Sequence, residues 1–418
     1  MERPPFAPRR LGELARVVGP GIVVAATGVG AGDLVAAVKS GATYGLPLLW
    51  CAVVGALLKF ALAEGVARWQ LATGFTILEG WGRLLGGTVR LLFLAYLLLW
   101  TFVVAAALMS ACGLAAHALF PAIPLNVWAI PHAVGALAFV WLGEYGGFEN
   151  AMKAVIGVMF VSILGSAFVQ GPAASEVLRG LLVPQVPPGG TVLVMGVIGG
   201  VGGTLTLLSY NYWMRGEGSG WQRAVRFDLG VGYLLTGLFG VAVILLSGVV
   251  LLPRGIEITG SHGVLRMAAL LGESFGRPGE LVFLVGFWGA VASSLLGVWQ
   301  GVPYLFSDTV ALLRRGTESS LDATVSRRGW VYRGYLLFMT FPPMLLLLLG
   351  RPVWLVVAYA ALGSLFMPFL AVTLLFMNNR RSEMGGLKNG LLANASLVLC
   401  VLLFVYLAVV EILGRIFD

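Results

Sequence analysis

Acidic residues inside long apolar stretches are the first candidates for chemistry in this sequence. Asp33 lies in the stretch 17–41 and directly follows a glycine-rich segment. An acid surrounded by apolar residues is costly and is normally functional or paired. A carboxylate beside free backbone carbonyls makes an oxygen-only ligand set, which suits hard cations such as Mg²⁺, Ca²⁺ or Mn²⁺. Asp33 is therefore a candidate metal, solute or proton ligand, and the alternative is a structural ion pair with Lys39 or Lys59.

A second acid, Glu64, lies in the stretch 45–70 between two basic residues. Arg68 follows Glu64 by four residues, a spacing that favours an ion pair on one face of a helix. Lys59 precedes Glu64 by five residues. The group of Glu64, Arg68 and Lys59 fits a proton relay or gate and, equally well, a structural ion pair.

Two glycine-rich segments interrupt apolar stretches. The first runs from Gly19-Pro20-Gly21 through residues 27–33, and the second is Gly-Gly-Val-Gly-Gly-Thr at 199–204. Each glycine inside a helix costs about 1 kcal/mol relative to alanine, so these clusters favour a break. Unwound backbone at membrane depth is tolerated where it is buried in protein or lines a cavity. The alternative is that the glycines only let helices pack closely. The residues predicted to bind a solute or ion at these breaks are Asp33, Thr27, Gly28, Gly30, Gly202, Gly203, Thr204, Thr206 and Ser294.

Polar side chains also gather in the stretches 191–213 and 280–306. Single hydroxyl groups in such helices often bond to their own backbone, but their concentration here predicts a hydrated cavity. The second half of the first of these stretches is also expected to direct a helix N-terminus at the cavity, which suits an anionic group. The polar residues are Thr204, Thr206, Ser209, Tyr210 and Asn211 in the first stretch, and Ser293, Ser294, Trp299, Gln300 and Tyr304, followed by Asp308, in the second.

The elements that position these residues are membrane-spanning helices. Of 418 residues, 59% are hydrophobic and 11% are charged, and the mean hydropathy is +0.92. Soluble domains keep about 25% charged residues, and a span needs about 20 mostly apolar residues. The sequence therefore predicts an all-α integral membrane protein with eleven spans, near 17–41, 45–70, 90–119, 123–143, 151–170, 191–213, 229–252, 280–306, 331–350, 353–377 and 391–416.

The two breaks lie about 170 residues apart and begin two blocks of five spans. Because each block has an odd number of spans, the second block enters the membrane from the opposite side. Glycine-interrupted segments at matching positions of an inverted repeat are typical of the binding site of a secondary transporter. We expect one membrane domain over 17–418, divided into repeats near 17–170 and 191–377 and an extra helix near 391–416, after a tail of residues 1–16.

The basic residues are distributed asymmetrically. With the N-terminus in the cytoplasm, nineteen Lys and Arg fall on the cytoplasmic side and six on the other. This positive-inside pattern predicts a cytoplasmic N-terminus and, after eleven spans, an outside C-terminus in the inner (plasma) membrane. It also explains the net charge of +8 without a nucleic-acid partner. Residues 1–10 lack the apolar run of a signal peptide.

Other chemistries find no support in the sequence. The three histidines lie away from the breaks, and the three cysteines fall inside spans without metal-ligand spacing. No phosphate loop, catalytic triad or zinc motif is present. We therefore expect no enzymatic activity and no cofactor, and the expected partners are the lipid bilayer, an ion or small solute, and a proton as coupling ion.

Several motifs together resemble the Nramp family. The likeness covers Gly19-Pro20-Gly21, the break that ends at Asp33, the segment 40–45 (Ser-Gly-Ala-Thr-Tyr-Gly) and the segment 364–369. It extends over nearly the whole chain. The resemblance implies a LeuT-like fold with spans 1 and 6 unwound at a central site, and proton-coupled uptake of divalent metal.

The metal-binding motif of that family does not carry over. Its Asp-Pro-Gly-Asn aligns with Gly-Ala-Gly-Asp at 30–33, its Met-Pro-His-Asn with Gly-Thr-Leu-Thr at 203–206, and its span-10 glutamine with Phe366. Only Asp33 is left to inherit a ligand role. Loss of the thioether removes selection for soft transition metals, so Mg²⁺ or Mn²⁺ is favoured.

Glycines in place of the ligands are expected to enlarge the cavity. The alternatives are a small organic or anionic solute on the same fold, or a membrane sensor that does not transport.

Overall fold

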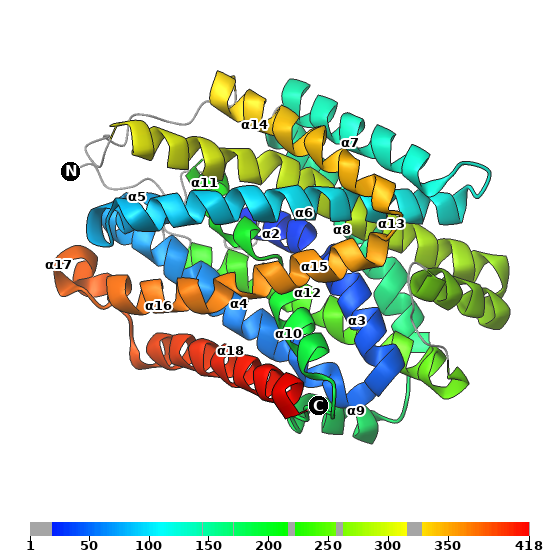
Figure 1. The fold of residues 1–418 in the computed structure, drawn as a ribbon. Coiled ribbons are helices and arrows are strands. Elements are labelled where there is room, and N and C mark those ends of the chain that lie inside the picture. Colours follow the sequence, from blue (N-terminus) through cyan, green and yellow to red (C-terminus); the bar gives the residue numbers. More distant parts are fainter. Residues whose placement is uncertain are drawn as a thin grey trace.

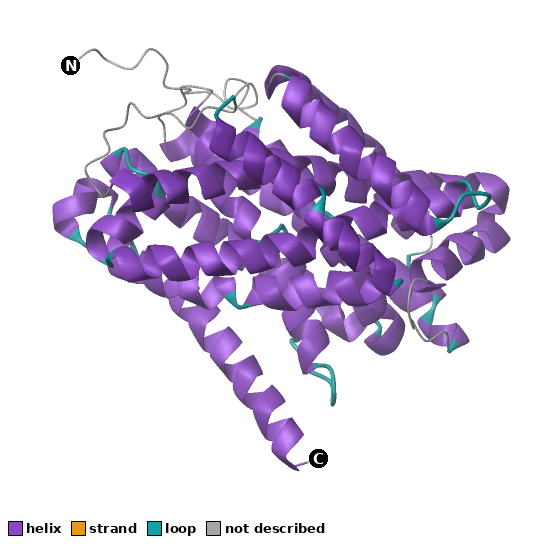
Figure 2. Cartoon of the chain, turned by 45° about the horizontal axis from the view of Figure 1, so that its top comes forward, coloured by secondary structure: helices purple, strands orange, loops and turns teal. Residues whose placement is uncertain are grey.

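The computed structural model describes residues 19–143, 145–169, 171–215, 222–255, 262–315 and 328–417. Over these residues the chain is helical and contains no strand (Figures 1 and 2). The tail 1–16 lies outside the described residues. The helices are α2 (Pro20–Gly28), α3 (Ala31–Tyr44), α4 (Leu49–Thr73), α5 (Ile77–Leu84), α6 (Gly87–Leu119), α7 (Leu125–Leu142), α8 (Tyr145–Val169), α9 (Ala174–Leu182), α10 (Thr191–Gly200), η3 (Leu205–Ser209), α11 (Tyr210–Arg215), α12 (Gln222–Val250), α13 (His262–Arg315), α14 (Trp330–Thr340), η6 (Pro342–Leu349), α15 (Pro352–Ser364), α16 (Phe366–Asn378), α17 (Arg381–Met384) and α18 (Leu391–Phe417).

The predicted eleven-span layout is confirmed. Ten helical segments of the described residues are long and apolar enough to cross a membrane. The remaining predicted span is the pair α2 and α3, which falls short of that length because it is broken. The sequence did not predict the short helices α5 and α9, since their polar residues hide them in hydropathy. A capping box between Thr76 and Glu79 starts α5.

Both predicted breaks are present. The first separates α2 from α3 at Val29 and Gly30. The second separates α10 from the 3₁₀ helix η3, and it contains Gly202 and Gly203 at φ +78° and +67°. Backbone in this left-handed region strongly favours glycine. α15 and α16 are divided at Leu365, where the backbone angles stay helical.

The broken helices lie in the middle of the bundle. α2 lies at the centre of Figure 1, and α3 runs from it toward the lower right. α12 packs along both of them, and α13 packs against α2. α10 packs against α3, α4 and α15. α18 lies at the edge against α16 and α4 (Figure 1). The breaks are therefore buried in protein, which is the condition under which unwound backbone is tolerated in a membrane.

Candidate solute site at two helix breaks

The two breaks touch each other through glycine backbone. A Cβ atom added to Gly28 would lie 2.6 Å from the Cα atom of Gly202, and one added to Gly203 would lie 3.3 Å from the Cα atom of Gly28. Only glycine permits two backbones to approach this closely. The glycines here therefore serve both purposes that the sequence left open, breaking the helices and letting them pack.

The expectation that glycines enlarge the cavity is wrong at the two positions that replace family ligands. The space beside Gly30 is filled by Ser294, whose Cβ atom would lie 2.5 Å from a Cβ added there. The space beside Gly203 is filled by Thr206 and by the backbone of Gly28. The physical reason is that the neighbouring segments occupy the volume that a ligand side chain would need.

The carbonyl groups at the end of α2 are capped by hydroxyl groups from α13. Ser293 Oγ donates to Ala26 O at 2.8 Å, and Ser294 Oγ donates to Thr27 O at 2.8 Å. These carbonyls have no onward helical turn to bond with, because α2 ends at Gly28. The hydroxyl of Thr27 is buried and has no hydrogen-bond partner among the described residues. This buried oxygen lies against Gly297 of α13.

The carbonyl groups at the end of α10 are capped by a charged group. Lys59 of α4 is fully buried, and its Nζ atom donates to Gly199 O at 2.6 Å and to Gly200 O at 3.4 Å. It also donates to Gly203 O. An ammonium group at the C-terminal end of a helix is favoured by the partial negative charge there. The sequence analysis grouped Lys59 with Glu64 and missed this contact. A lysine inside a predicted span needs buried acceptors, and the carbonyls of a predicted break could have been proposed as those acceptors.

Asp33 occupies the third position of α3, one turn after the break. The side chains of residues 31–33 lie outside the described part of the chain. The role of Asp33 as a ligand stays a prediction.

Thr204 and Thr206 are both buried at the second break. Thr204 packs against α15, since a Cβ added to Gly363 would lie 2.5 Å from Thr204 Oγ1. The segment that follows is the five-residue 3₁₀ helix η3. It continues directly into α11, and a helix N-terminus facing an anionic group at this break stays a prediction.

Most of the polar side chains predicted to line a hydrated cavity instead bond across helices. Tyr210 donates to Asp228 at 2.9 Å, and Trp299 donates to the Thr340 hydroxyl at 2.9 Å. The remaining contacts of this kind are Trp213 with Gln300, and Thr76 and Tyr212 with Asp308. By contrast, the side chains of Ser209 and Asn211 have no partner among the described residues.

The predicted pair of Glu64 and Arg68 forms and is joined by a third residue. Arg68 Nη2 lies 3.1 Å from Glu64 Oε2, and Arg226 of α12 lies 2.8 Å from Glu64 Oε1. Arg68 also donates to Asn389 Oδ1 at 2.7 Å. The cluster ties α4 to α12 and to the start of α18, an arrangement that fits a structural pair or a gate.

A buried acid that sequence reasoning did not single out holds the start of α2. The Asp228 carboxylate accepts hydrogen bonds from the backbone N–H groups of Gly19 at 3.1 Å and Gly21 at 2.7 Å. Such a carboxylate satisfies donors that a helix start leaves free. Tyr210 bonds to the same carboxylate, so α11 and α12 together fix the first half of span 1.

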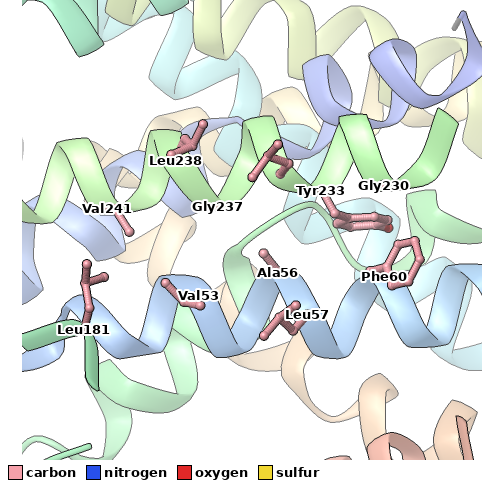
Figure 3. A pocket seen from close by; sticks show the side chains of 11 residues that line it. Val53, Ala56, Leu57, Phe60, Leu181, Gly230, Tyr233, Gly237, Leu238 and Val241 are labelled. Atoms are coloured by element: carbon pink, nitrogen blue, oxygen red, sulfur yellow. The ribbon is translucent and has the colours of Figure 1, made fainter. Parts of the chain in front are cut away.

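A cavity of about 390 Å³ lies between α4 and α12. Figure 3 shows Val53, Ala56 and Leu57 of α4 facing apolar residues of α12 across it. Leu57 and Leu234 are 62% and 63% exposed, so the cavity opens on the lipid-facing side. Its lining is apolar apart from Tyr233, whose ring lies against Gly202. It has no ligand set for a cation.

No group of three or more His, Cys, Asp or Glu side chains converges anywhere in the described ranges. A metal held at the breaks would therefore depend on backbone carbonyls, hydroxyls and Asp33. This donor set is made of oxygen atoms, which suits hard divalent ions.

Comparison with known proteins gives a consistent assignment. The family model described as "Natural resistance-associated macrophage protein-like" matches residues 21–414. A divalent metal cation transporter MntH of Mycobacterium tuberculosis is 25% identical over 305 residues, which are 68% of this chain and 68% of the relative. The MntH of Chromohalobacter salexigens is 24% identical over 391 residues, covering 89% of this chain and 85% of the relative.

Solved structures agree on the fold. A mutant of the manganese transporter of Eremococcus coleocola superimposes with a TM-score of 0.78 at 17% identity, over 99% of this chain and 89% of that chain. MhsT in complex with L-phenylalanine superimposes with a TM-score of 0.64 at 14% identity, over 98% and 99% of the two chains. The fold is thus the predicted LeuT-like arrangement with two unwound spans. With its family model matched along nearly its entire length, the chain belongs to the Nramp family of multi-pass membrane transporters.

Proposed function

We propose that this protein is a secondary active transporter of a divalent metal cation. The observation that carries the proposal is the contact between two helix breaks, Gly28 against Gly202, at the centre of a bundle whose family relatives are named divalent metal cation transporters. Buried broken helices supply carbonyl oxygens at membrane depth, and such sites recur in transporters of this architecture.

The cation site proposed here lies on the α2–α3 side. Its ligands are the Asp33 carboxylate, the Thr27 hydroxyl and carbonyl groups near Gly28, with Ser294 holding the Thr27 carbonyl in place. Gly30 shapes the same side, and Thr204, Thr206, Gly202 and Gly203 shape the opposite wall. Because these ligands are oxygen atoms, Mg²⁺ or Mn²⁺ is favoured over softer transition metals. Uptake is coupled to protons, with the N-terminus cytoplasmic.

The test is uptake of Mn²⁺ into proteoliposomes loaded with a metal-sensitive dye, with and without an inward proton gradient. Wild-type protein is expected to take up Mn²⁺ faster when the outside is acidic. Asp33→Asn should abolish uptake while the protein stays folded. Glu176→Gln, which neutralises an exposed acid on α9, is the matched control and should behave as wild type. Unchanged uptake in Asp33→Asn would contradict the proposed ligand.

The fixed charge of Lys59 favours a second candidate, a small organic or anionic solute carried on the same fold. An ammonium group within the breaks attracts a carboxylate or oxyanion and repels a cation. A thermal-shift screen separates the two candidates. Stabilisation by carboxylate or oxyanion compounds, with none by Mn²⁺ or Mg²⁺, would replace the metal by the anionic solute. A protein that neither binds nor transports any of these would point to a sensor.

A further inference from the structure

Lys59 contacts the α10 break in the way that a bound cation would. Its Nζ atom is within hydrogen-bond distance of three backbone carbonyls, those of Gly199, Gly200 and Gly203. Backbone carbonyls freed by a helix break are ligands of hard cations in proteins. The three carbonyls converge because the chain turns through positive φ at Gly202 and Gly203. The α10 break is thus a carbonyl site for a cation, and a side chain of α4 fills it.

The α2 break differs in one decisive respect. Its carbonyls are capped by the neutral hydroxyls of Ser293 and Ser294. A carbonyl oxygen has two lone pairs, so a carbonyl that accepts from a hydroxyl can still face a metal ion. A carbonyl that faces an ammonium group cannot, because the metal and the ammonium would repel each other at contact distance.

We infer that Lys59 is a specificity-determining residue, a tethered cation that occupies the carbonyl site of the α10 break and confines any transported divalent cation to the α2–α3 side. The inference rests on the proposed function for the identity of the cargo. The inference goes beyond the proposed function because it assigns the α10 half of the central site to the ammonium group of Lys59. A cation held from one side only keeps part of its hydration shell, so binding is weak and selects poorly among hard ions.

The alternative is a structural role, in which Lys59 only caps the C-terminal end of α10. That role requires hydrogen-bond donors on the carbonyls and gains from the charge at the helix end, but it predicts no change in the affinity for a metal ion. Lys59→Gln separates the two, because the glutamine amide still donates to carbonyls and is neutral. Lys59→Arg is the matched control, since it keeps both the charge and the donors.

The experiment is Mn²⁺ binding to the purified full-length chain in detergent, measured by isothermal titration calorimetry and by the Mn²⁺-dependent shift in melting temperature. Lys59→Gln is expected to bind Mn²⁺ on the order of tenfold more tightly than wild type or better, because a like charge has been removed. Lys59→Arg is expected to bind as wild type or more weakly. Binding by folded Lys59→Gln that is no tighter than wild type would overturn the inference.

Lys59→Met is a second neutral variant that also lacks the hydrogen-bond donor, and a tighter Mn²⁺ affinity is expected of it too. If neither neutral variant folds while Lys59→Arg does, Lys59 is a cap and the inference falls. The proposed function is tested separately by the uptake assay. If wild-type protein takes up no Mn²⁺ into proteoliposomes, Mn²⁺ is not the transported ion. The comparison of Lys59→Gln with wild type would still report whether the lysine blocks a cation site.

Discussion

The carbonyls at the end of α2 accept hydrogen bonds from two serine hydroxyls of α13, whereas those at the end of α10 accept from the ammonium group of Lys59 on α4. Both breaks leave backbone acceptors without an onward helical turn, and both receive their donors from a helix of the other five-span block. The first break is capped by neutral groups and the second by a charge.

The difference teaches that two breaks at matching positions need not be chemically equivalent. A neutral cap satisfies the backbone and leaves the site open to a charged solute. A charged cap satisfies the backbone and also fixes which sign of charge the site accepts. Because each cap comes from the opposite block, a change at either break alters a contact between the two blocks.

The largest effect is expected where the two breaks touch. Gly28→Ala places a methyl group against the backbone of Gly202 and should lower the free energy of unfolding by about 3 kcal/mol, with loss of uptake. Gly157→Ala is the matched control, since nothing lies within 4 Å of its added methyl group. That exchange should instead stabilise α8 by about 0.5–1 kcal/mol. Melting temperatures of both variants check the opposite signs, and equal shifts would refute the close contact.

Replacing Lys59, the charged cap of α10, should lower the free energy of unfolding by nearly as much as Gly28→Ala. Lys59→Met leaves the α10 carbonyls without their donor, and a buried unsatisfied acceptor costs about 1–3 kcal/mol. We expect a clear fall in melting temperature, smaller for Lys59→Gln and smallest for Lys59→Arg. A Lys59→Met protein as stable as wild type would show that these carbonyls are satisfied without the lysine.

Weakening the support of α2 from its other end should have an intermediate effect. Asp228→Asn replaces a carboxylate that accepts from Gly19, Gly21 and Tyr210 by a group with one acceptor oxygen, at a cost of about 2 kcal/mol. Amide hydrogen exchange over residues 19–28 should become faster than in wild type. Glu273→Gln, an exposed neutralisation on α13, should leave that exchange unchanged. Equal exchange in both variants would show that Asp228 does not hold α2.

The neutral cap should be the least costly to remove. Ser293→Ala and Ser294→Ala are expected to cost about 1 kcal/mol each, since each removes one hydroxyl donor from a carbonyl. The double variant should deviate from the sum, because the two hydroxyls serve adjacent carbonyls. Ser166→Ala, whose hydroxyl donates within α8, is the control. If the serine variants lost more unfolding free energy than Lys59→Met, the ranking of the two caps would be reversed.

The sequence alone predicted the spans and both breaks. Hydropathy and glycine clustering are local properties, and a bilayer allows no other solution for twenty apolar residues than a helix. The pairing of Glu64 with Arg68 was likewise predictable from their spacing of four residues. Asp33 was located as the acid beside the first break, and its role remains a prediction.

Only the tertiary structure decided which side chain caps which break. Lys59 meets Gly199 across 140 residues of chain, and Ser294 meets Thr27 across 267. No local pattern encodes such a pairing, because it follows from how the two blocks of spans pack together. The same packing turned glycines that were expected to open a cavity into points of backbone contact. The chain thus specified by itself where its helices break, while the fold determined that one break is neutral and the other carries a charge.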